Sequence, residues 1–104
     1  MPKPLPRETQ RATVAIVPAR NEAGNVGPLV EEIRRLFPDL AVLVVDDASS
    51  DHTGGEARRA GAAVLTLPCN LGIAGAVQAG YRYAVERDYR YAVRLDGDGQ
   101  HDPA

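Results

Sequence analysis

Two aspartates one residue apart are the residues of this chain best suited to chemistry. Asp96 and Asp98 come directly after segment 91–95, in which large apolar residues occupy every second position and which ends at Leu95. Two carboxylates this close repel each other, and a hard divalent cation such as Mg²⁺ or Mn²⁺ relieves the repulsion and bridges to substrate phosphates. Gly97 and Gly99 allow a sharp turn close to a ligand. These residues favour an open metal site for a phosphorylated substrate, with a plain Asp-Gly turn as the alternative.

Two further polar clusters follow apolar runs. Asp46 and Asp47 come directly after the continuously apolar segment 40–45, and the polar segment 18–22 follows the β-branched segment 13–17. We expect one carboxylate of the Asp46–Asp47 pair to accept hydrogen bonds from backbone amides in the turn and the other to face a ligand.

The elements that position these clusters alternate along the chain. Short apolar runs predict strands, and apolar residues at helical spacing predict helices between them. Strands are predicted near residues 13–17, 40–45, 63–67 and 91–95, and helices near 26–37, 51–60 and 76–85. This order favours an α/β fold with three α/β/α layers and a mainly parallel sheet. Ligands of such sheets bind at the carboxyl ends of the strands, so the polar clusters are expected to meet there.

Several polar and glycine residues near the helix starts have a structural explanation. Asp51 is predicted to cap the second helix. Asn70 and Gly72 precede the third helix, where a weak phosphate-cradling loop and simple packing both stay open. Gly75 and Gly80 are assigned to close packing of that helix on the sheet.

Composition and charge exclude several classes of protein. The chain has 104 residues, a formal net charge of −2 and no basic run with interleaved aromatics, which argues against a nucleic-acid partner. Cys69 is the single cysteine, so no intrachain disulfide is expected. With neither a membrane-length apolar run nor a signal-peptide pattern, we expect a cytoplasmic protein; peripheral attachment to the inner face of the membrane stays open. Residues 1–12, rich in Pro and charge, are predicted to form a flexible tail before a domain at 13–104.

Four segments together resemble the N-terminal half of the family 2 glycosyltransferases, which have the GT-A fold. They are residues 14–22, 44–53, 70–80 and 95–103, in the order and spacing of the family. The last segment looks most like the branch that contains dolichyl-phosphate mannosyltransferase and the bacterial polyprenyl-phosphate glycosyltransferases. The resemblance covers essentially the whole chain after the tail.

The resemblance implies a donor, a metal and an acceptor. Members bind a nucleoside-diphosphate sugar, of the GDP-mannose or UDP-glucose type, with Mg²⁺ or Mn²⁺ and transfer the sugar with inversion; in this branch the acceptor is a polyprenyl phosphate. The positions assigned to nucleotide binding are Pro18, Ala19, Arg20, Glu22, Asp46, Asp47, Asn70, Gly72 and Asp96. The positions assigned to the metal are Asp96, Asp98 and Gln100, with Asp98 as the catalytic residue.

The length of the chain departs from the family pattern. The acceptor-binding half of the family lies beyond the position that Asp98 matches, and this sequence ends at Ala104. We therefore expect donor binding with little or no transfer by this chain, and self-association into a homo-oligomer through an uncovered sheet edge. The alternatives are a nucleotide-binding module without transferase activity, or a nucleotidyltransferase-like fragment. The second is disfavoured because no glycine- and arginine-rich phosphate loop follows the first strand.

Overall fold

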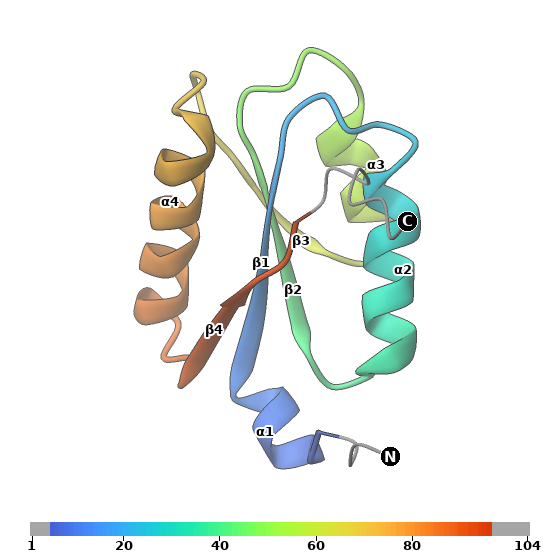
Figure 1. Cartoon of the computed structure of the whole chain (residues 1–104), viewed down its shortest axis with the longest axis vertical. Helices are drawn as coiled ribbons and strands as arrows, with labels where there is room; N and C mark the ends of the chain where they lie inside the picture. The colour runs from blue at the N-terminus through green and yellow to red at the C-terminus, as the bar shows by residue number, and fades with distance from the viewer. Residues whose placement is uncertain (1–4, 97–104) are drawn as a thin grey trace, which may run out of the picture.

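A computed structural model describes residues 5–96 of the chain. Its four strands form one parallel sheet in the order β3-β2-β1-β4. The strands are β1 (Thr13–Ala19), β2 (Ala41–Asp46), β3 (Ala63–Thr66) and β4 (Tyr91–Arg94), and the helices are α1 (Arg7–Arg11), α2 (Val26–Leu36), α3 (Thr53–Arg59) and α4 (Gly72–Glu86). Helices α2 and α3 cover one face of the sheet and α4 covers the other (Figure 1). The predicted three-layer α/β fold is confirmed.

The two central strands carry the core on both faces of the sheet. Along β1, Val17 packs with α2 and α3, whereas Ile16 packs under α4. Their partners across the ladder, Val44 and Leu43, alternate in the same way. All four side chains are fully buried. Continuous apolar runs in β1 and β2 are therefore explained by burial on both faces, as in other parallel sheets.

The order of the strands places the candidate site. The chain moves outward from β1 to β2 and β3 with α2 and α3 on one face, and then returns through α4 on the other face to β4. The direction of winding therefore reverses at β1, which lies between β2 and β4. Parallel sheets bind ligands outside the strand ends at such a reversal.

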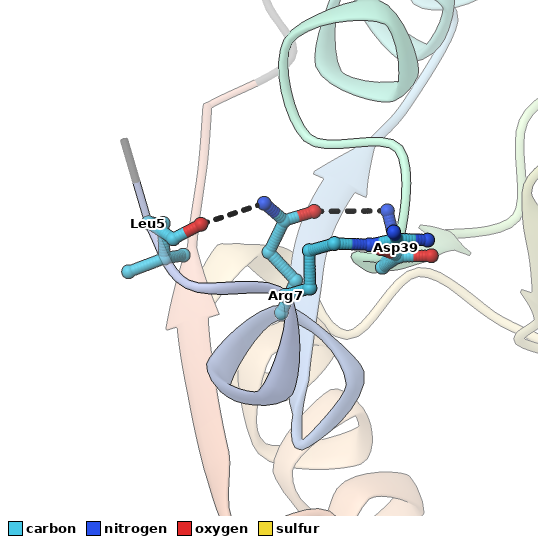
Figure 2. A network of polar contacts seen from close by, with 4 residues as sticks. Leu5, Arg7 and Asp39 are labelled. Atoms are coloured by element: carbon cyan, nitrogen blue, oxygen red, sulfur yellow. Dashed lines mark hydrogen bonds and ion pairs between the residues drawn. The ribbon is translucent and has the colours of Figure 1, made fainter. Parts of the chain in front are cut away.

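The prediction of a flexible tail at residues 1–12 is wrong for residues 7–11, which form α1; residues 1–4 lie outside the described part of the chain. Gln10 is only 5% exposed. Its side-chain Nε2 donates to the Leu5 carbonyl and its Oε1 accepts from the Asp39 amide, both at 2.9 Å (Figure 2). Arg7 adds an ion pair with the Asp39 carboxylate at 2.7 Å. Composition alone suggested a tail because Asp39, which bonds to both Arg7 and Gln10, lies about thirty residues away in sequence.

The other predicted strands and helices are all present, with small shifts at their ends. Helix α3 has its N-cap at His52, one residue later than predicted. The Asp51 carboxylate nevertheless accepts hydrogen bonds from the Thr53 amide, at 3.0 Å, and from the Thr53 hydroxyl. The predicted N-cap position of Asp51 is therefore wrong by one residue, although its carboxylate still bonds to the first residue of α3. Within residues 5–96, the helices all lack the length and apolarity needed to cross a lipid bilayer.

Candidate functional site

A cavity of about 240 Å³ lies at the carboxyl edge of the sheet. It is lined by Pro18, Ala19, Arg20, Glu22, Asp47, Ile73, Ala76 and Asp96. These residues come from the end of β1 and its following loop, from the end of β2, from the start of α4 and from the segment after β4. The polar clusters that follow the first, second and fourth strands therefore meet at one place, as the parallel sheet predicted.

Asp47 fixes the geometry of this cavity. The residue is 4% exposed, and its two carboxylate oxygens accept from the Leu71 amide at 2.7 Å and the Gly72 amide at 2.9 Å. Its own amide donates to the Ala19 carbonyl at 2.9 Å. Asp47 thus joins the ends of β1 and β2 to the start of α4, where a negative charge is favourable. Each carboxylate oxygen has a second lone pair, so Asp47 can also accept from a ligand.

Asp46 is buried beside Asp47 but does not line the cavity. One of its oxygens accepts from the Ser49 amide at 3.0 Å. The other lies close to Gly54, where a Cβ atom would approach it to 2.9 Å. The sequence predicted one carboxylate bound to backbone amides and the other facing a ligand. In the structure both accept from amides, and Asp47 alone of the pair also faces the cavity.

Asn70 and Gly72, two further predicted nucleotide-binding residues, lie outside the cavity lining. The Gly72 amide donates to Asp47 and to Asn70 Oδ1, which is 2.9 Å away. Gly72 has φ +80°, a left-handed conformation that favours glycine. The Asp47 carboxylate already occupies the amides of Leu71 and Gly72, so this helix start holds α4 in place. Nucleotide binding by Asn70 and Gly72 stays a prediction.

Asp96 is the predicted metal ligand that the structure places at the cavity. Its side chain is 61% exposed and forms an ion pair with Arg94 at 3.2 Å. The other predicted ligands, Asp98 and Gln100, lie outside the described residues. The catalytic role of Asp98 therefore stays a prediction. Between residues 5 and 96, no three His, Cys, Asp or Glu side chains gather closely enough to hold a metal. The carboxylate chemistry of Asp96 nevertheless suits Mg²⁺ or Mn²⁺.

Because carboxylates outnumber cations around the cavity, the lining favours a ligand with hydrogen-bond donors, and an anionic group on that ligand would need Arg20 or a metal ion as its partner. Arg20 supplies a cation, while Glu22, Asp47 and Asp96 supply carboxylates. Ile73 of α4 adds an apolar wall, although it is 61% exposed. Ile73 and Ala76 were not predicted to line the site. Both residues could have been predicted from their helical spacing directly after a loop at the carboxyl edge of the sheet.

The family is decided by a match over nearly the whole chain. The model of glycosyl transferase family 2 matches residues 14–104. The chain belongs to glycosyltransferase family 2. The polyprenol monophosphomannose synthase of Mycolicibacterium smegmatis is 35% identical over 103 residues, which cover 93% of this chain and 38% of that protein. The undecaprenyl-phosphate mannosyltransferase of Micrococcus luteus is 38% identical over 95 residues, which cover 86% and 39%.

The fold agrees with the family. Glucosyl-3-phosphoglycerate synthase from Mycobacterium tuberculosis, solved with UDP, superposes with a TM-score of 0.71 at 22% identity, over 94% of this chain and 39% of that one. Another structure of that synthase contains Mn²⁺, UDP and glucosyl-3-phosphoglycerate. The resemblance found in the sequence is thus confirmed for family and fold. The family 2 chain spans less than two fifths of the length of these relatives.

Proposed function

We propose that the cavity binds the nucleotide part of a nucleoside-diphosphate sugar together with Mg²⁺ or Mn²⁺. The observation that carries this proposal is the convergence of Arg20, Asp47 and Asp96 from three strand ends on one cavity of about 240 Å³. Sites for small molecules usually occupy roughly 300–1,000 Å³, so this cavity suits part of a donor. The rest of the donor site would come from residues beyond the described part of the chain.

The lining residues divide into two groups by chemistry. Asp47 and Glu22 can accept hydrogen bonds from the base or the ribose, and Arg20 can pair with a phosphate oxygen. Asp96, with Asp98 and Gln100, would hold the cation. When bound, the cation supplies Lewis-acid stabilisation of the diphosphate that leaves the sugar. In this arrangement Arg20 would pair with the diphosphate directly, and the carboxylates would act on it only through the cation that they hold.

We further propose that the longer protein transfers a hexose to a polyprenyl phosphate, with inversion at the anomeric carbon. The relatives named polyprenol monophosphomannose synthase and undecaprenyl-phosphate mannosyltransferase support this acceptor and favour mannose as the sugar. A lipid phosphate is already anionic, so it can attack without a general base. Such an acceptor would place the reaction at the inner face of a membrane.

Donor binding can be tested on the chain itself. GDP, UDP, GDP-mannose and UDP-glucose would be titrated by calorimetry with Mn²⁺ and with EDTA. We expect nucleotides of one base to bind with Mn²⁺, and binding at least about tenfold weaker with EDTA or in Asp96→Ala, because a charge-assisted contact to the metal is lost. The matched control is Glu86→Ala, an exposed carboxylate at the far end of α4. Absence of binding by both the folded chain and a protein of full family length would refute the proposal.

A further inference from the structure

The loop between β1 and α2, which carries Arg20 and Glu22 to the cavity, is held by side chains from another segment. Four consecutive backbone amides of this loop, at residues 21–24, each donate to a side-chain oxygen of the segment 49–56. The acceptors are Ser49 Oγ for Asn21 at 2.9 Å, Thr53 Oγ1 for Glu22 at 2.8 Å, Asp51 Oδ2 for Ala23 at 3.2 Å and Glu56 Oε1 for Gly24 at 2.7 Å. The shape of the loop is therefore set by the β2–α3 connection and by α3.

Glu56 of α3 makes the strongest of these connections. Its two oxygens accept from the amides of Gly24 and Gly27, each at 2.7 Å. Gly27 is the second residue of α2, whose own N-cap residue, Asn25, makes no side-chain capping bond. The Glu56 carboxylate thus caps α2 from a neighbouring helix, and it lies where the α2 dipole favours a negative charge. A hydrogen bond to a carboxylate is also stronger than one between neutral groups.

Glycines at both donor positions make this close approach feasible. A Cβ atom on Gly27 would lie 2.9 Å from both Cγ and Oε2 of Glu56, nearer than such atoms can pack. Gly24 has φ +92°, a left-handed conformation that other residues rarely adopt. Both glycines and the carboxylate are therefore needed for the contact as it stands.

We propose that Glu56 is a positioning residue for donor binding, although it does not line the cavity. By fixing residues 24 and 27, Glu56 holds the loop so that Arg20 and Glu22 stay at the cavity before a ligand arrives. Such preorganisation strengthens binding because less conformational entropy is lost on association. This inference rests on the proposed function of the same cavity, and it adds the residue that keeps the loop in place.

The first test compares Glu56→Gln with a matched control. Glutamine keeps the size of the side chain, but its NH₂ group must face one of the two amides, so one hydrogen bond is lost. We expect the Kd for GDP or UDP with Mn²⁺, whichever the wild type binds, to rise about tenfold or more. The control is Ile33→Val, which removes one buried methylene from the opposite half of α2 and leaves the hydrogen bonds of the loop unchanged. A merely structural role would lower the stability of both variants and leave both Kd values unchanged.

The second test needs no ligand. Amide hydrogen exchange at residues 21–24 and 27 of the free protein is expected to be about tenfold faster in Glu56→Gln, but not in Ile33→Val. Unchanged exchange at these amides would overturn the inference, and so would faster exchange with an unchanged Kd. If neither the wild-type chain nor a protein of full family length binds a nucleotide, the proposed function fails by itself. The exchange rates then still decide whether Glu56 anchors the loop.

Discussion

The carboxylate of Asp47 both stabilises the fold and lines the candidate site. Its two oxygens accept hydrogen bonds from backbone amides at the start of α4, and its own amide donates to the Ala19 carbonyl at the end of β1. A ligand that bonds to Asp47 would therefore contact a group whose orientation is already fixed from three sides. Fixed acceptors of this kind raise selectivity, because a ligand without matching donors leaves them unpaired.

Replacing Asp47 with alanine is expected to affect stability and binding together. The change leaves the Leu71 amide without its charged acceptor, whereas the Gly72 amide keeps Asn70 Oδ1 as an acceptor, and a hydrogen bond to a charged group contributes about 1.5–3 kcal/mol. We expect the free energy of unfolding in urea to fall by about 2 kcal/mol and nucleotide binding to weaken more than about tenfold. In the control Asn70→Ala, the Gly72 amide keeps Asp47 as its acceptor, so a smaller loss is expected. Equal stability of Asp47→Ala and wild type would contradict this assignment.

Asp51 predicts a dependence of stability on pH. Hydrogen bonds from the Thr53 hydroxyl, and then from backbone amides of Thr53 and Ala23, hold the pKa of Asp51 below its ordinary value. A lowered pKa in the folded state stabilises the fold above the unfolded pKa of about 3.9, and this contribution is lost as the pH falls through the folded value. We expect wild type to be more stable than Asp51→Asn above about pH 5, with the difference shrinking in acid. Denaturation between pH 2 and 6 checks this, and a difference independent of pH would contradict it.

The packing of α4 against the sheet depends on the absence of a side chain at Gly80. A Cβ atom on Gly80 would lie 2.4 Å from Ile16 Cγ2, in the centre of the sheet, so the helix backbone rests directly on β1. The close packing predicted for Gly80 is confirmed. Gly75 differs, because its Cβ would meet Leu71 Cβ at 2.5 Å and not the sheet. Gly75 therefore makes room for the turn that Asp47 holds.

Two glycine-to-alanine changes should have opposite effects. Gly80→Ala forces a methyl group against Ile16, and overpacking of this kind costs about 1–3 kcal/mol. Gly55→Ala, in α3, places the methyl group at an ordinary 3.6 Å from the Arg59 side chain. It should stabilise by up to about 1 kcal/mol through helix propensity. Thermal unfolding of both variants tests the contrast, and a Gly80→Ala protein as stable as wild type would show that α4 can shift outward freely.

The elements that sequence predicts well are those defined by local patterns. The buried runs of β1 and β2 and the apolar stripe of α2 lie in neighbouring residues, and parallel topology then brings their polar ends together. The failures concern partners distant in sequence. Gln10 Oε1 accepts from the amide of Asp39, and the Gly72 amide donates to Asp47, twenty-five residues earlier. No local pattern states which carboxylate a given amide will meet, so α1 and the role of Gly72 emerge only from the assembled fold.

At the scale of the whole molecule, the β4 edge of the sheet is exposed, unlike the buried central strands. β4 pairs with β1 alone among the described strands, and it exposes Tyr91 by 52% and Val93 by 43%. On the α4 side of the molecule, Tyr81 and Val85 are also exposed. Unpaired backbone groups beside apolar side chains are a template for association with another chain. The same edge lies next to Asp96, so its partners also bear on the candidate site.

Self-association through the β4 edge is expected, and it can be distinguished from non-specific association of exposed apolar surface. Lysine on an edge strand blocks pairing, because burying its charge against another strand is unfavourable. We expect the wild-type chain of 11.1 kDa to scatter light as a dimer or larger species at micromolar concentration, and Tyr91→Lys and Val93→Lys to shift it towards monomer. The matched control is Leu36→Lys, because Leu36 is also 52% exposed but lies at the end of α2. A wild-type monomer at every concentration would contradict the expectation, and an equal effect of Leu36→Lys would assign the association to exposed apolar surface in general and not to the β4 edge.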